Sequence, residues 1–242
     1  MSITRYPLLE TTPYELLVAQ GQVPNVTNVN IYGTQASVDG TYIPIWENAT
    51  PYVYQTSAST KLLYSSSASD TNVTVLIRGL DANYVPISET IVLTNGTTGV
   101  TTVNSYLRIT EILIPQTATV NPVGILRLSS ADKATTYAQI NVGAGRSQMC
   151  IYTVPAGYTF YLERVSAYTS AGPNKTTYYR SETRSPTGII QQVLTTPFVT
   201  EYKVDRIVPR PYPEKTDIQF QATSDAVSFV SIQVEGYLIK NP

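Results

Sequence analysis

The chain has 242 residues, of which 42% are hydrophobic and only 14% charged, with a formal net charge of −1 and no histidine. This near-neutral charge provides no field that would concentrate the chain on nucleic acid, and no apolar run approaches the roughly 20 residues of a membrane span. We therefore expect neither nucleic acid nor a membrane as a partner. Histidine is the commonest general base and metal ligand, so its absence predicts no catalytic site, no metal site and no cofactor.

Residues 1–50 are predicted to form an extended N-terminal arm. Its first ten residues lack the basic-then-apolar pattern of a secretion signal, which predicts synthesis in the cytosol. Thr12, Pro13 and Glu15 fit the N-cap, N1 and N3 positions of one short helix, which would end at Gly21. The rest of the arm is expected to be loop, because prolines and glycines interrupt it at Pro24, Gly33, Gly40 and Pro44.

From about residue 51 the pattern changes to strand, turn, strand. Apolar residues alternate with mostly polar ones in 72–79, a turn follows at 81–83, and 87–94 has the composition of a second strand. This arrangement predicts a β-hairpin. Further strands are expected at 106–114 and 124–128.

A second β region follows the small, polar stretch 129–145, which is the expected linker. Its clearest predicted strands are 149–154 and 158–168, and apolar residues alternate again towards the end of the chain. Turns recur about every ten residues, a spacing typical of antiparallel sandwiches. The predicted fold is therefore all-β, with two tandem antiparallel β-sandwiches at 51–140 and 141–242 preceded by the arm.

Few side chains are candidates for catalysis. Cys150 lies between Met149 and Ile151 in an apolar strand, which favours a core position over a nucleophile. Paired carboxylates could still catalyse glycoside hydrolysis, but Glu163 and its neighbours stand in no recognisable motif. A charge on a strand usually marks the solvated face, so we expect no enzymatic activity.

Nineteen tyrosines are the feature that most favours an interaction surface, because tyrosine is enriched at protein and glycan contacts. Ordinary strand and core positions are an equal alternative for the set as a whole. Tyr178, Tyr179 and Tyr212, which lie near turns and prolines, are the expected surface contacts. The arm adds spaced apolar side chains that are expected to lie on a second copy or another protein: Tyr6, Leu8, Leu9, Leu16, Leu17, Val18 and Ile31.

An alternative position for the arm is against its own chain. Termini are commonly tied down in this way, with Leu16 and Val18 then capping the first β domain. Trp46, the only tryptophan, is expected to be buried and to fix the arm to that domain.

Several short motifs follow one another along the chain: GQVP at 21–24, VNIYG at 29–33, SVD at 37–39, IWE at 45–47, RGLDANY at 78–84, SETIVLTNGT at 88–97, YLRI at 106–109, YTVPAGYT at 152–159 and PEKTDI at 213–218. Each motif alone is weak, but the ordered series resembles a family of tailed-bacteriophage virion structural proteins, frequent in marine and cyanobacterial phages. The chain departs from the family's pattern at 30–33 and at 46–49, within the arm.

The resemblance implies a non-enzymatic component of the virion. Within that class we expect a capsid decoration or cement protein that binds the major capsid protein as a homo-oligomer, with a trimer as the first expectation. The alternatives are a tail, collar or fibre-attachment component, and a glycan-binding adhesin that uses exposed tyrosines. Hundreds of copies per particle would indicate decoration, whereas a tail part needs about a dozen or fewer.

Overall fold

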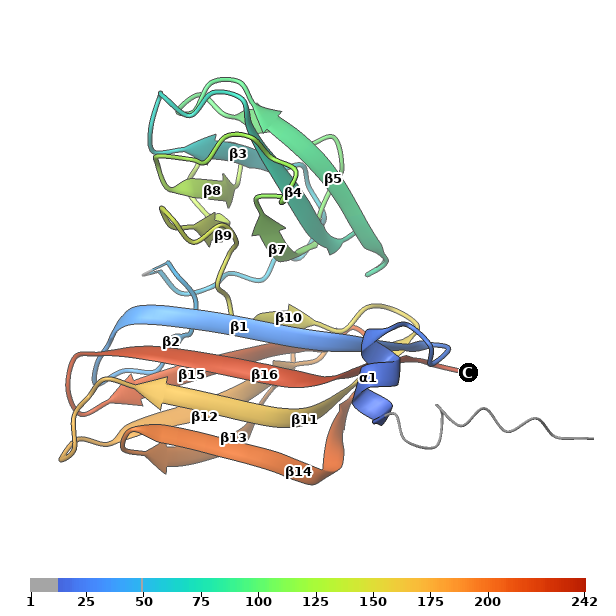
Figure 1. The fold of residues 1–242 in the computed structure, drawn as a ribbon, viewed down its shortest axis with the longest axis vertical. Coiled ribbons are helices and arrows are strands. Elements are labelled where there is room, and N and C mark those ends of the chain that lie inside the picture. The colour runs from blue at the N-terminus through green and yellow to red at the C-terminus, as the bar shows by residue number, and fades with distance from the viewer. Residues whose placement is uncertain (1–12, 49) are drawn as a thin grey trace, which may run out of the picture.

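The fold consists of two stacked pairs of antiparallel β-sheets, shown in Figure 1 for the computed structural model of the chain. The structure describes residues 13–48 and 50–242. The upper pair, which we call the inserted sandwich, is built from 62–140. The lower pair, which we call the base sandwich, combines strands from 26–44 with strands from 151–240. The predicted all-β class is confirmed.

The inserted sandwich contains β3 (Leu62–Ser65), β4 (Val73–Leu80), β5 (Pro86–Leu93), β6 (Val100–Thr101), β7 (Arg108–Leu113), β8 (Leu126–Ser129) and β9 (Thr136–Ile140). One sheet has the order β6-β3-β8-β9 and the other the order β5-β4-β7. The predicted hairpin is present, because β4 pairs with β5 from Val73↔Leu93 to Leu80↔Pro86. Its alternation places Val75 and Ile77 in the core between the two sheets.

The base sandwich contains β1 (Val26–Val38), β2 (Ile43–Pro44), β10 (Ile151–Thr153), β11 (Tyr158–Thr169), β12 (Thr177–Arg184), β13 (Ile190–Phe198), β14 (Glu201–Tyr212), β15 (Asp217–Ser224) and β16 (Ser228–Lys240). One sheet has the order β1-β16-β11-β14. The other has the order β10-β15-β12-β13, with β2 also beside β15. Phe160, Phe220 and Val230 are among the side chains that fill the core between them.

The prediction of an arm is wrong for residues 26–44. These residues supply β1, which pairs antiparallel with β16, and the short β2. Val29 and Ile31 pack in the base core while Asn28 and Asn30 face solvent, which is ordinary strand alternation. The sandwiches are therefore not simply tandem: the inserted sandwich interrupts the base sandwich between β2 and β10.

Gly33 explains why β1 resembles a loop in the sequence. A Cβ atom at this position would lie 2.3 Å from the Cys150 backbone nitrogen and 2.4 Å from the Ile45 backbone oxygen. Glycine in a strand commonly marks such a close approach of another backbone. Here the approaching segments are the two connections between the sandwiches.

The predicted short helix is present as α1 (Tyr14–Ala19), which packs on β1. Its N-cap is Pro13, without a side-chain cap hydrogen bond, and the helix ends before Gly21, whose φ of 69° is left-handed. Thr12 lies outside the described residues. The expected linker 129–145 is too long, because β9 occupies 136–140 and only the residues after it connect the sandwiches.

Candidate interaction surfaces

A buried ion pair joins the two sandwiches. Arg108 at the start of β7 donates from Nε and Nη2 to the two carboxylate oxygens of Asp217 in β15, at 2.8 and 2.9 Å. The two side chains are only 7% and 3% exposed. Thr153 Oγ1 also donates to Asp217 at 2.6 Å, and Arg108 Nη1 donates to the Gln55 carbonyl oxygen at 2.8 Å. The surrounding hydrogen bonds leave neither charge buried without a partner, and loss of either member of such a pair is strongly destabilising.

The two connecting segments pack against each other as well. Trp46 is buried in the core of the inserted sandwich, with its ring edge-on to Tyr52 at 5.3 Å, and its Nε1 donates to the Thr50 carbonyl oxygen at 3.0 Å. The predicted burial of Trp46 is confirmed. Next to it, the Glu47 carboxylate accepts a hydrogen bond from the Gln148 backbone nitrogen at 3.2 Å. Burial raises the pKa of Glu47 to about 7.

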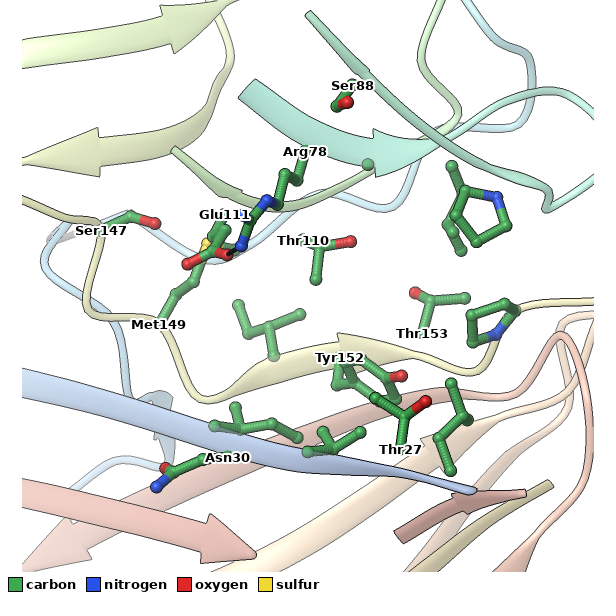
Figure 2. Close-up of a pocket in the computed structure, with 18 of the residues that line it drawn as sticks. Thr27, Asn30, Arg78, Ser88, Thr110, Glu111, Ser147, Met149, Tyr152 and Thr153 are labelled. Carbon is green, nitrogen blue, oxygen red and sulfur yellow. Dashed lines mark hydrogen bonds and ion pairs between the residues drawn. The ribbon is translucent and has the colours of Figure 1, made fainter. Parts of the chain in front are cut away.

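A pocket of about 460 Å³ lies between the sandwiches, and Figure 2 shows its lining. Its floor is β1 and β10, and its roof comes from β4, β5 and β7. Apolar side chains such as Val29, Ile87 and Met149 form much of the wall. At the rim, Glu111 accepts from Arg78 at 2.6 Å and from Arg146 at 2.8 Å. We call this the interdomain pocket, and its size is that of a typical binding site.

The pocket lies beside the free edge of β1. This strand is the first of its sheet, and within the described chain residues 26–32 pair along β16 alone. The whole of β1 contains no charged residue. Free edges are usually protected by charges or prolines, so a neutral edge of this length is an available pairing surface.

The opposite edge of the same sheet carries an exposed apolar protrusion. Leu162 of β11 pairs with Arg210 of β14, but Arg164 pairs with Asp205, so 206–209 find no register partner on β11. Within this bulge, Ile207 is 101% exposed and Val208 is 79% exposed. We call residues 206–209 the β14 knob. Bulges of this kind redirect side chains away from the sheet.

The outer face of this sheet is aromatic and polar. Register places Tyr32 of β1, Gln233 of β16 and Ser166 of β11 in one row across it. Tyr168 lies in the neighbouring row and is also exposed. This composition is common at contacts with proteins and glycans.

Two of the tyrosines predicted as surface contacts are buried, so that prediction is wrong for them. The ring of Tyr179 packs near Phe198 and Tyr202 in the base core. Tyr212 stacks on Phe160 at 6.1 Å. Strand alternation is the reason: Tyr179 occupies an inward position on β12, and only its neighbour Tyr178 faces away from that core, half-buried.

The predicted contact residues of the arm also divide into buried and exposed ones. Val18 and Ile31 are buried within the chain, the second of them in the base core, so neither is available to a partner. Leu16 is exposed and Leu17 is half-buried. Because α1 packs on β1, Val18 does not cap the first β domain as the alternative expected. Three predicted contacts lie outside the described residues: Tyr6, Leu8 and Leu9.

The described residues contain no group of His, Cys, Asp and Glu side chains that could hold a metal ion. None of their helices is long and apolar enough to cross a membrane. Cys150 is fully buried, as predicted, and burial raises the pKa of its thiol well above the usual value. A thiol of this kind is poorly reactive.

No protein-family model and no curated protein matches the chain. Two solved structures of infectious bursal disease virus were found, one of the Gx strain and one of the Gt strain. Their identities are 7% and 8%, and their TM-scores are 0.21 and 0.18. The alignments cover 94% and 96% of this chain, and 78% and 83% of the viral chains. Similarity this low carries no argument about fold or function.

Proposed function

We propose that this chain is a non-enzymatic structural protein of a tailed-phage virion and, within that class, a capsid decoration or cement protein. The observation that carries the proposal is the pair of unsatisfied surfaces on one sheet, the apolar β14 knob and the neutral edge of β1. An exposed aliphatic side chain gains about 1.5–3 kcal/mol when a partner buries it fully. Surfaces of this kind favour a protein whose working state is an assembly.

The junction between the sandwiches supports the same proposal, because a protein that bridges several subunits benefits from halves that are tied together. The Arg108–Asp217 pair and the buried Trp46 both tie the sandwiches together. Each bound copy would then stabilise the shell by mass action, because it binds the assembled lattice and not the free capsid subunit.

The partner under this proposal is the major capsid protein, and the chain acts as a homo-oligomer. The contact with the particle is assigned to the beginning of the chain, from residue 1 to the exposed Leu16 of α1. β1 begins at Val26, so a deletion long enough to reach this strand would disturb the base sandwich as well as attachment. A deletion that tests attachment has to stop at residue 12, before α1.

The experiment compares binding of two variants to particles stripped of the native protein. The first lacks residues 1–12 and also carries Leu16→Ser. The matched control keeps residues 1–12 and carries Val142→Ser, which removes an exposed aliphatic side chain from the connection after β9. We expect the first variant to lose most of its binding and the control to bind like the unmodified chain. Equal binding by the two variants would overturn this assignment.

A second candidate function, glycan binding, is favoured by the row that contains Tyr32 and Gln233 on the outer face of the base sandwich. Exposed tyrosine rings stack on sugar faces, and amide side chains bond to hydroxyl groups. Glycan binding by the isolated chain that is lost in Tyr32→Ala and Tyr168→Ala would establish this alternative. Unchanged glycan binding in both variants would exclude this face.

A further inference from the structure

We propose that the β14 knob of one copy inserts into the interdomain pocket of a second copy, so that the chain assembles head to tail. This inference names the partner surface within the proposed homo-oligomer. It concerns self-association of the isolated chain. Self-association could therefore be absent from a true virion protein, or present in a chain that has no virion role.

The chemistry of the two surfaces is complementary. The knob presents Ile207 and Val208 to solvent, and Pro209 after them has no backbone N–H to leave unpaired. The pocket offers an apolar wall that includes Val29, Ile87 and Met149 in a volume of about 460 Å³. Two aliphatic side chains would replace water on both surfaces, which is the main source of binding free energy between proteins.

The two surfaces lie at opposite edges of one sheet. The order β1-β16-β11-β14 puts the knob on one outer strand and the pocket beside the other. The two strands have similar lengths, 12 residues in β14 and 13 in β1. A copy can therefore offer its knob to one neighbour and its pocket to another at the same time.

The absence of charge on β1 also favours this contact. A free edge of seven residues, 26–32, spans about 24 Å of strand and carries no charged side chain or proline that would oppose pairing. β14 itself carries charges of both signs, such as Lys203 and Asp205, and no charge on β1 repels either of them.

The contact joins two different patches, so it is heterologous. A heterologous contact closes into a ring when the rotation between neighbours divides a full turn, and otherwise it forms a filament. Each copy contributes its knob to one neighbour and its pocket to the other. The expected trimer would be such a ring.

The test uses sedimentation velocity on the purified full chain across a range of concentrations. The knob variant carries Ile207→Ser and Val208→Ser, and the pocket variant carries Ser88→Trp, which places a large ring at an exposed lining position of β5. A matched control removes two exposed aliphatic side chains elsewhere, Ile189→Ser and Val227→Ser. Every substituted position is exposed, so near-ultraviolet circular dichroism should report an unchanged fold in all three.

We expect the unmodified chain and the control to self-associate equally. Two aliphatic side chains are removed in the knob variant, so its dissociation constant should rise about a hundredfold or more. The pocket variant should also be monomeric. A mixture of the knob and pocket variants should form a dimer and nothing larger, because one intact knob then meets one intact pocket.

Three results would overturn the proposal. The first is an unmodified chain that remains monomeric at every concentration. The second is self-association of either the knob or the pocket variant at the level of the unmodified chain. The third is a mixture of the two variants that stays monomeric, since an intact knob and an intact pocket would then be insufficient.

Discussion

The two sandwiches are built from the chain in opposite ways. The inserted sandwich takes all its strands from one continuous stretch, 62–140, and its largest pairing is a local hairpin. The base sandwich pairs β1 with β16, whose partners Val26 and Ile239 are more than two hundred positions apart. Local pairings leave a pattern that can be recognised in sequence, whereas a strand whose partner is remote is recognised only by its own alternation.

The largest expected effect comes from breaking the junction between the sandwiches. Arg108→Ala leaves Asp217 buried without its partner, and such a loss costs about 3–5 kcal/mol. We expect denaturant unfolding to shift to lower concentration and to separate into two transitions, one for each sandwich. The control is Arg164→Ala, which breaks exposed ion pairs with Asp205 and Glu235 and should cost no more than about 1 kcal/mol. Equal shifts in both variants would contradict a junction of this kind.

Trp46→Ala should lower the free energy of unfolding by a similar amount, and the inserted sandwich should loosen before the base sandwich does. Removal of a buried aromatic ring costs about 3–5 kcal/mol because the cavity relaxes only partly. The measurement is the free energy of unfolding, together with hydrogen exchange of β4 and of β16 to show which sandwich loosens. A change within about 0.5 kcal/mol would mean that the ring is free in solution.

Gly33→Ala tests how closely β1 of the base sandwich packs against the two connections. The added methyl group would meet the backbones of Cys150 and Ile45, and overpacking of this kind costs about 1–3 kcal/mol. Gly40→Ala is the matched control, since nothing lies within 4 Å of its Cβ position. A Gly33→Ala protein as stable as the Gly40→Ala protein would contradict the position of β1 against these connections.

The smallest expected effect is a pH dependence at the connections. The pKa of Glu47 is raised from 4.5 to about 7, chiefly by burial, so the folded state holds this proton more tightly than the unfolded state. Stability from this group is therefore present at low pH and is lost as pH rises from 4.5 through 7. Glu47→Gln should flatten the fall in Tm over that interval, whereas Glu201→Gln, an exposed control, should not. Parallel Tm curves for the unmodified chain and Glu47→Gln would contradict the burial of this carboxylate.

The sequence predicts the structure correctly where the residues adjacent in the chain decide whether a side chain is buried or paired. The 72–94 hairpin follows from alternation and a turn, and the burial of Trp46 and Cys150 follows from their apolar surroundings. Proximity to turns does not predict the burial of Tyr179 and Tyr212, because strand parity decides which side chains face the core. Parity is the better guide when a strand faces a core.

The candidate surfaces were harder to predict. Arg108 and Asp217 stand 109 positions apart, and nothing near either residue marks the pair. The pocket has no sequence signature at all, because strands of both sandwiches that are far apart in the sequence enclose it. The knob did leave a sign: Ile207, Val208 and Pro209 break the alternation of β14, and such a break indicates a bulge.

The most direct test of the central claim is a cryo-electron microscopy map of the purified phage particle with this chain located in its density. The account predicts the chain on the outer capsid surface in hundreds of copies, with the base and inserted sandwiches in one fixed arrangement. A map with about a dozen copies at the tail or collar would contradict a cement role, and a particle without the chain would contradict any virion role.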